Sequence, residues 1–168
     1  VLYGLRDYAD YFIASPAEIL ANGFPYDKIV PWLWGDEEDL KRVCAEYFNY
    51  YNTYPDPNNA GWNSATVALV KSSELQHLVE LTSNIVGENK CVASTDVWRY
   101  PLSKSSLPNV FYDLGDYINT YGDESQQSAY KQQLEKTVVF KAATPTFFGQ
   151  SFPAYKFSGL SVYIPQTR

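Results

Sequence analysis

The chain has 168 residues, of which 45% are hydrophobic and 19% charged, a balance typical of one globular domain rather than of a disordered segment. Its net charge of −6 argues against nucleic acid or an anionic membrane as a partner, because neither attracts a negative surface. No apolar run approaches the roughly 18 residues that a membrane-spanning helix needs, so we expect no membrane span. The start from Val1 to Arg6 lacks the basic lead and the apolar core of a signal peptide.

Two features of the sequence lead us to expect that it is part of a longer chain. It begins with Val1 inside an expected helix, and it contains no methionine, although a chain of this length normally holds several. We therefore expect a fragment or a processed product of a longer protein. Methionines left unwritten because they are modified would explain the second observation equally well.

The first third of the chain predicts a short helix, a strand and a long helix. The apolar run from Tyr11 to Ala14 predicts a buried strand, which ends at Ser15-Pro16 because proline cannot donate to a β-ladder. The long helix begins at Asp36, where four consecutive acidic residues favour the positive end of the helix dipole. One apolar stripe follows at helical spacing: Leu40, Val43, Cys44, Tyr47, Tyr50 and Tyr51.

The rest of the chain alternates strands and helices. A buried strand is expected over 65–70, followed by a capping box of Ser73 and Gln76 and by a helix that Gly87 ends. The helical spacing of Phe111, Leu114, Ile118 and Tyr121 predicts a further helix, and a polar helix is expected over 124–136. Further strands are expected over 137–142 and 160–164. With no repeat or linker, this alternation predicts a single α/β domain with a largely parallel sheet.

The residues alone indicate no active site. The single histidine, His77, lies beside an apolar helical stripe and is expected on the surface. Cys44 falls within the stripe and is expected to be buried, whereas Cys91 follows Lys90 without a histidine nearby and is expected to be structural or incidental. The acidic run 36–39 is better explained by helix-terminal charge than by a bound cation, since consecutive helical residues point in different directions. We therefore expect no metal ligands.

Several segments resemble a known family. The stretch 5–19 with its continuation 23–29 resembles the region just after the catalytic cysteine of clostripain-like cysteine peptidases. The segments 64–69, 111–117 and 157–165 resemble later parts of that family in the same order. The resemblance covers nearly the whole chain, and it implies that residues 1–168 are the C-terminal portion of one peptidase domain. The implied fold is a caspase-like α/β/α sandwich with a largely parallel sheet, present as a partial domain.

The resemblance also implies an activity. The family cleaves after basic residues, mostly arginine, with a cysteine–histidine dyad, often requires calcium, and is secreted or attached to the bacterial cell envelope. Its histidine, its nucleophile and the acidic residue of its S1 pocket all precede the point that matches Val1. No catalytic residue is therefore assigned to this chain. The expected partners are a peptide or protein with a basic P1 residue and the upstream segment, which processing would turn into a separate chain.

The resemblance assigns one wall of the substrate-binding site to this chain. Ser15, Pro16, Ala17 and Glu18 match the family's loop beside the S1 pocket. Glu18 would supply negative potential for a basic side chain, and Asp27 is a further candidate. The alternative is that Ser15-Pro16 merely ends a strand and that Glu18 is solvated.

Two other functions remain open at this point. A protein of the same fold that has lost its nucleophile would bind peptides without cleaving them. An aromatic-rich carbohydrate-binding module would need exposed aromatic side chains on a flat face, whereas Tyr47, Tyr50 and Tyr51 lie on a stripe that is expected to be buried.

Overall fold

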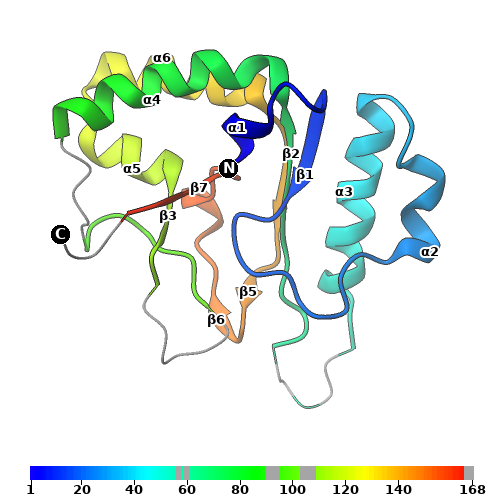
Figure 1. Ribbon diagram of the computed structural model, residues 1–168. Helices are drawn as coiled ribbons and strands as arrows, with labels where there is room; N and C mark the ends of the chain where they lie inside the picture. Colours follow the sequence, from blue (N-terminus) through cyan, green and yellow to red (C-terminus); the bar gives the residue numbers. More distant parts are fainter. Residues whose placement is uncertain (56–57, 59–60, 90–94, 103–108, 165–168) are drawn as a thin grey trace.

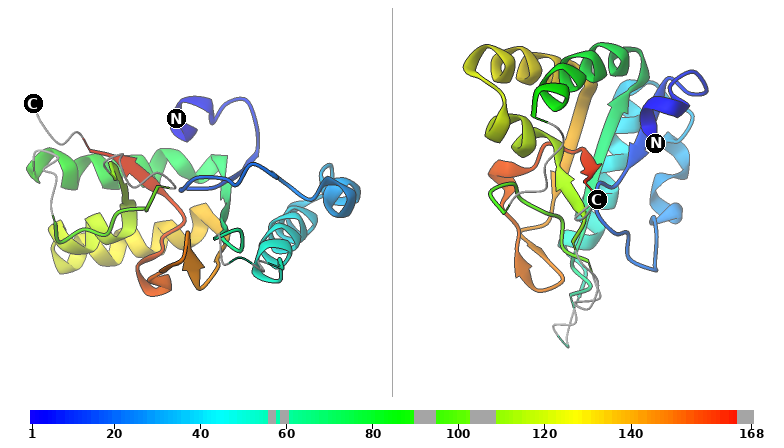
Figure 2. Two further views of the ribbon diagram at one scale, coloured as in Figure 1. Left: turned by 90° about the horizontal axis from the view of Figure 1, so that it is seen from below. Right: turned by 60° about the vertical axis from the view of Figure 1, so that its left-hand side comes forward.

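The computed structural model describes residues 1–55, 58, 61–89, 95–102 and 109–164. Its centre is a three-stranded sheet in the order β1 (Tyr11–Ala14), β2 (Thr66–Lys71) and β4 (Val138–Ala143). Helix α3 packs on one face of this sheet, and α4 and α6 lie on the other side (Figure 1). Seen from below, the sheet stands between these two groups of helices (Figure 2). The arrangement is an α/β/α sandwich, which confirms the predicted fold class.

The remaining elements surround this sheet. The strands β3 and β7 form a second, two-stranded sheet, and β5 and β6 form a third. The bounds of the helices and minor strands are α1 (Leu2–Leu5), α2 (Tyr26–Ile29), α3 (Glu37–Asn52), α4 (Leu75–Asn89), β3 (Phe111–Asp113), α5 (Leu114–Tyr121), α6 (Glu124–Thr137), β5 (Thr146–Phe147), β6 (Gln150–Ser151) and β7 (Ser161–Tyr163).

The central strand β2 is buried on both faces. Val67 and Leu69 pack against α3, while Ala68 and Val70 pack into a second core beneath α4, α5 and α6. Successive side chains of a strand point to opposite faces, so one short apolar run fills both cores. The continuous apolar run that predicted a buried strand here is therefore confirmed.

Helix α3 follows the predicted pattern closely. Asp36 is its N-cap, and its carboxylate accepts hydrogen bonds from the backbone amides of Glu38 and Asp39. The predicted stripe faces the sheet, and four of its members are fully buried: Val43, Cys44, Tyr47 and Tyr51. The acidic run is thus explained by the helix terminus, as the sequence indicated.

The prediction of a largely parallel sheet is wrong for the described strands, because β1 pairs with β2, and β2 with β4, in antiparallel fashion. The reason lies at one end of the sheet. Gln133, near the end of α6, donates from Nε2 to the carbonyl oxygen of Glu74 at 3.1 Å, directly after β2. The register, with Val70 opposite Val138 and Thr66 opposite Ala143, likewise places the end of β2 and the start of β4 at the same end of the sheet. Alternation of strands and helices does not by itself fix strand direction.

Three local predictions also differ from the structure. The chain turns through a 3-10 helix over Ser72–Glu74, so α4 begins at Leu75, and the side chain of Gln76 bonds to Glu80 and Tyr3 instead of capping the helix. Gly87 lies inside α4 rather than after its end. Phe111 belongs to β3, and the helix that it was expected to join begins at Leu114.

A buried polar cluster joins β3 to the segment before β7. The carboxylate of Asp113, which is fully buried, accepts hydrogen bonds from the Tyr100 hydroxyl at 2.6 Å and from the Ser158 amide at 2.8 Å. It also accepts from the Asp116 amide at 3.0 Å and so caps α5. Burial raises the pKa of Asp113, in opposition to these hydrogen bonds. The cluster therefore ties together two of the segments that carried the family resemblance.

Candidate functional site

The loop after β1 is fixed by the hydroxyl of Ser15. Its Oγ lies 2.6 Å from Oγ1 of Thr66 on β2, and it bonds to both the amide and the carbonyl of Ala17. These contacts turn the chain sharply at the end of the strand and close the loop on itself. The position of the predicted substrate-binding loop therefore depends on one side chain that is anchored to the central strand.

A groove of about 500 Å³ opens beside this loop. Ala14, Ser15 and Pro16 form one wall, and α4 and the segment that leads into β7 contribute the apolar side chains of Leu78 and Leu160. Tyr163 and Phe111 pair their rings at a centroid distance of 6.2 Å on the outer side and remain substantially exposed. This volume is in the range of ligand sites, but the lining is mainly apolar and is suited to bury apolar groups.

The outer edge of β1 borders the same region. Among the described residues β1 pairs with β2 alone, so its other edge carries no strand. The side chains from Tyr11 to Ala14 are half-buried, unlike those of β2. An edge strand with unpaired backbone groups accepts either another strand or an extended peptide.

The predicted site residues divide into three groups. Ser15 and Pro16 line the groove. Ala17 turns the other way and packs against an aromatic cluster that includes Tyr100 and Phe147, while Glu18 is half-buried outside the groove lining. Asp27 is exposed in the first turn of α2, which lies beside α3 and away from the groove (Figure 1). The roles of these residues in substrate binding stay predictions.

The described residues contain no cysteine–histidine pair. Cys44 is fully buried on α3, where desolvation raises the pKa of its thiol to about 12, so it is an inert thiol at neutral pH. His77 is exposed on α4, on the opposite side of the sheet. Both findings confirm the sequence interpretation, whereas Cys91 lies outside the described residues. The described part of the chain also has no group of three or more acidic, cysteine or histidine side chains placed to hold a metal.

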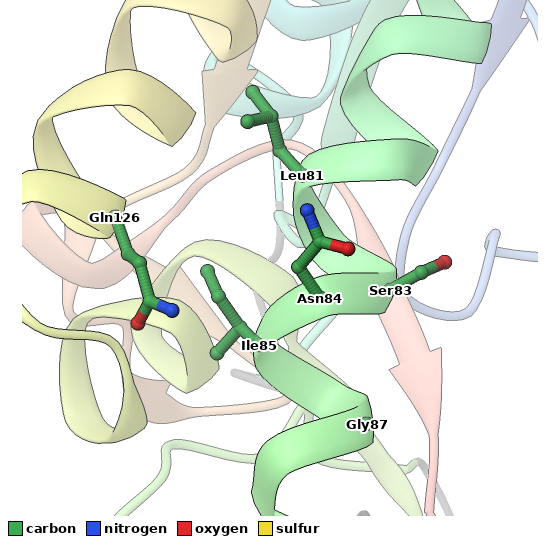
Figure 3. A pocket seen from close by; sticks show the side chains of 6 residues that line it. All are labelled: Leu81, Ser83, Asn84, Ile85, Gly87 and Gln126. Atoms are coloured by element: carbon green, nitrogen blue, oxygen red, sulfur yellow. The ribbon is translucent and has the colours of Figure 1, made fainter.

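A separate cavity of about 510 Å³ lies between α4 and the start of α6 (Figure 3). None of the six residues that line it is ionisable: Leu81, Ser83, Asn84, Ile85, Gly87 and Gln126. Gln126 already accepts a hydrogen bond from the Asp123 amide in the capping box of α6. This cavity therefore offers no ionisable acid or base, and its lining contains no group that could activate the hydroxyl of Ser83.

Sequence reasoning missed the polar cluster of Asp113 and the free edge of β1. Tyr100, Asp113 and Ser158 come from three distant segments, and no spacing rule links them. The signal that was present is the resemblance of 111–117 and 157–165 to one family. No helix in the described part of the chain is long and apolar enough to span a membrane.

Comparison with known proteins gives a consistent result. The family model described as the Clostripain family matches residues 1–167. An inactive zymogen C11 protease from Parabacteroides distasonis has a similar structure, with a TM-score of 0.81 and 31% identity over 99% of this chain and 49% of its own. A clostripain from Bacteroides thetaiotaomicron in complex with the peptide inhibitor BTN-VLTK-AOMK gives a TM-score of 0.77 and 27% identity over 96% of this chain and 71% of its own.

A third similar structure is a secreted C11 cysteine protease from Bacteroides thetaiotaomicron in complex with an irreversible peptide inhibitor. Its TM-score is 0.79, with 26% identity over 99% of this chain and 49% of its own. The chain thus spans about half the length of two of these three structures. Among curated proteins, no match to the chain was found.

Proposed function

Because the chain belongs to the clostripain family of cysteine peptidases, we propose that it is the second half of the catalytic domain of a cysteine endopeptidase that cleaves after basic residues, arginine preferred. The observation that carries the proposal is the family match over residues 1–167 together with a fold that aligns with 49% of the zymogen. In this proposal the cysteine and the histidine lie on the segment that precedes Val1, and processing separates the two parts or leaves them joined.

The groove and the free edge of β1 are where the two halves meet in this proposal. The edge offers unpaired backbone groups to an upstream strand, and the apolar groove beside it offers burial to the side chains of that half. Ser15 lies at this junction, because its anchored loop begins where β1 ends. A nucleophile on an adjacent strand would then stand next to Ser15 and Pro16, as ligand sites do at strand ends in α/β folds.

The chemistry divides between the two halves. The thiolate of the upstream cysteine attacks the scissile carbonyl, backbone amides stabilise the oxyanion, and the histidine protonates the leaving amine. Water then hydrolyses the thioester and regenerates the thiol. The present chain contributes the wall that holds the substrate in position, with Ser15, Pro16 and Glu18 beside the P1 side chain.

Two observations support a basic P1 residue. The peptide of the inhibitor bound to the Bacteroides thetaiotaomicron clostripain, VLTK, ends in lysine. The chain is acidic, with a net charge of −6, and Glu18 lies in the loop beside the groove. A carboxylate in such a wall attracts a guanidinium or ammonium group more strongly than a neutral side chain.

The test uses the full-length gene product and three fluorogenic peptides that differ in their P1 residue, which is arginine, lysine or aspartate. We expect cleavage after arginine and lysine and none after aspartate. In Glu18→Ala, kcat/KM for the arginyl peptide falls by about tenfold, since one charge interaction is lost, whereas Glu124→Ala on the exposed start of α6 leaves it unchanged. Cleavage after aspartate, or a protein that binds these peptides without hydrolysing them, contradicts the proposal.

Calcium and export belong to the same proposal. We expect hydrolysis of the arginyl peptide to increase when calcium is added after treatment with a chelator. We also expect the protein in the culture medium or the cell envelope, in line with the relative that is described as secreted. If chelator and calcium leave the activity unchanged, the proposed calcium requirement is wrong. If the protein is confined to the cell interior, the proposed export is wrong.

A further inference from the structure

A third cavity, of about 380 Å³, is separate from the groove. Its walls come from α5, α6, β4 and the segment before β7, and it shares no lining residue with the groove. Three lysines line it: Lys131 on α6, Lys141 on β4 and Lys156 before β7. The acidic residue in its lining is Glu135. Three of the nine lysines of an acidic chain thus face one cavity.

Two of these three ammonium groups form no direct ion pair within the described part of the chain, although the carboxylates of Asp113 and Glu135 act on Lys141 from a longer distance. Lys156 pairs with Asp116 at 3.0 Å. Nζ of Lys141 donates to the carbonyl of Phe157, and among the described residues no carboxylate lies within 4.0 Å of Lys131 or Lys141. Lys141 is accessible, yet the surrounding walls reduce its hydration and lower its pKa. A cation in such surroundings gains more from an anion than a fully solvated one does.

A buried hydroxyl at the same cavity also lacks a partner. Tyr130 contributes to the lining, is 2% exposed, and its hydroxyl makes no hydrogen bond within the part of the chain that the structure describes. Buried polar groups in folded proteins are nearly always hydrogen-bonded, so this hydroxyl is available as a donor to a ligand that reaches it. At the rim Tyr155 is 87% exposed and offers an aromatic surface to the remainder of a ligand.

We propose that this cavity is an oxyanion-binding site, which takes a carboxylate or phosphate group between Lys131, Lys141 and Lys156. Ammonium groups bind both anions as point charges, and the volume is suited to a small ligand or to one or two side chains. The site is independent of the proposed peptidase function, because it lies outside the groove and contains none of the residues assigned to the substrate wall.

The experiment measures anion binding to the full-length protein by isothermal titration calorimetry at constant ionic strength, with inorganic phosphate and succinate as separate ligands. We expect saturable binding of at least one of them. Tighter binding of phosphate would identify a phosphate site, and tighter binding of succinate a carboxylate site. In Lys131→Gln/Lys141→Gln the affinity falls about tenfold or more, because two charge-assisted contacts are lost.

The matched control is Lys136→Gln, which removes an exposed lysine from the same helix, outside the cavity lining. It leaves the affinity unchanged if the site is specific. The single variant Lys131→Gln, at an exposed position, keeps the test valid if the double variant fails to fold. Absence of binding to both anions, unchanged affinity in the lysine variants, or an equal loss in Lys136→Gln overturns the proposal.

Discussion

The two faces of β2 are stabilised in different ways. Toward α3 the core is apolar and aromatic, with Tyr47 and Tyr51 stacked edge to face at a centroid distance of 5.0 Å. On the other side the core reaches a buried carboxylate, Asp113, which accepts three hydrogen bonds, two of them from other segments of the chain. An apolar stripe packs with many alternative partners, whereas a buried carboxylate tolerates few, because each lost donor leaves an unpaired group.

This difference explains why the packing on the α3 side of the sheet could be predicted from the sequence. On the α3 side, the residues that pack on the sheet come from a single helix, and their spacing by three and four residues specifies which side chains face the sheet. The Asp113 side depends on contacts between Tyr100, Asp113 and Ser158, which only the folded chain brings together.

The largest expected effect comes from Asp113→Ala. It removes the acceptor for the Tyr100 hydroxyl and for two backbone amides, so we expect the free energy of unfolding to fall by about 3 kcal/mol. Urea unfolding of the full-length protein measures the change. Asp113→Asn keeps one acceptor oxygen and should lose clearly less. Equal stability of Asp113→Ala and the unchanged protein would contradict the role given to the cluster.

A smaller effect is expected for Cys44→Ala on the apolar side. Loss of the buried sulfur leaves a small cavity, which costs about 1.5 kcal/mol at pH 7. The thiol pKa is about 12 when folded against an ordinary value of 9.0, so the unfolded state releases its proton first as the pH rises. The stabilising contribution of Cys44 is therefore complete below pH 9 and is lost as the pH rises toward 12.

The pH dependence is measured as the difference in unfolding free energy between the unchanged protein and Cys44→Ala, in which the tyrosine contributions cancel. We expect this difference to shrink as the pH rises above 9. A constant difference would indicate that Cys44 titrates equally in both states and is therefore not buried.

The smallest effects separate two neighbouring tyrosines. The Tyr51 hydroxyl donates to the carbonyl of Gly23 at 2.7 Å, so Tyr51→Phe should cost about 1 kcal/mol. The Tyr47 hydroxyl is buried without a partner among the described residues, so Tyr47→Phe should be neutral or slightly stabilising. Thermal unfolding of both variants compares them directly, and the reverse order would show that the apolar side also depends on hydroxyl contacts.

Local sequence signals predicted most elements of the fold and little of the site. Capping by Asp36, the stripe of α3 and the doubly buried β2 follow from residue spacing and charge. Strand direction was missed, since no local signal shows at which end of the sheet the chain returns after α6 to form β4. Ser15 was singled out by resemblance, but its anchoring on Thr66 and its place at the groove needed the fold.

The most direct test of the central claim is to find which cysteine is needed for activity. The full-length protein is inactivated with iodoacetamide under native conditions, and the alkylated cysteine is located by mass spectrometry. Our account predicts that activity is lost in step with one label upstream of Val1, while Cys44 stays unlabelled because its thiol is buried and protonated. Loss of activity in step with alkylation of Cys44 or Cys91 would contradict the account, because the nucleophile would then lie in this chain.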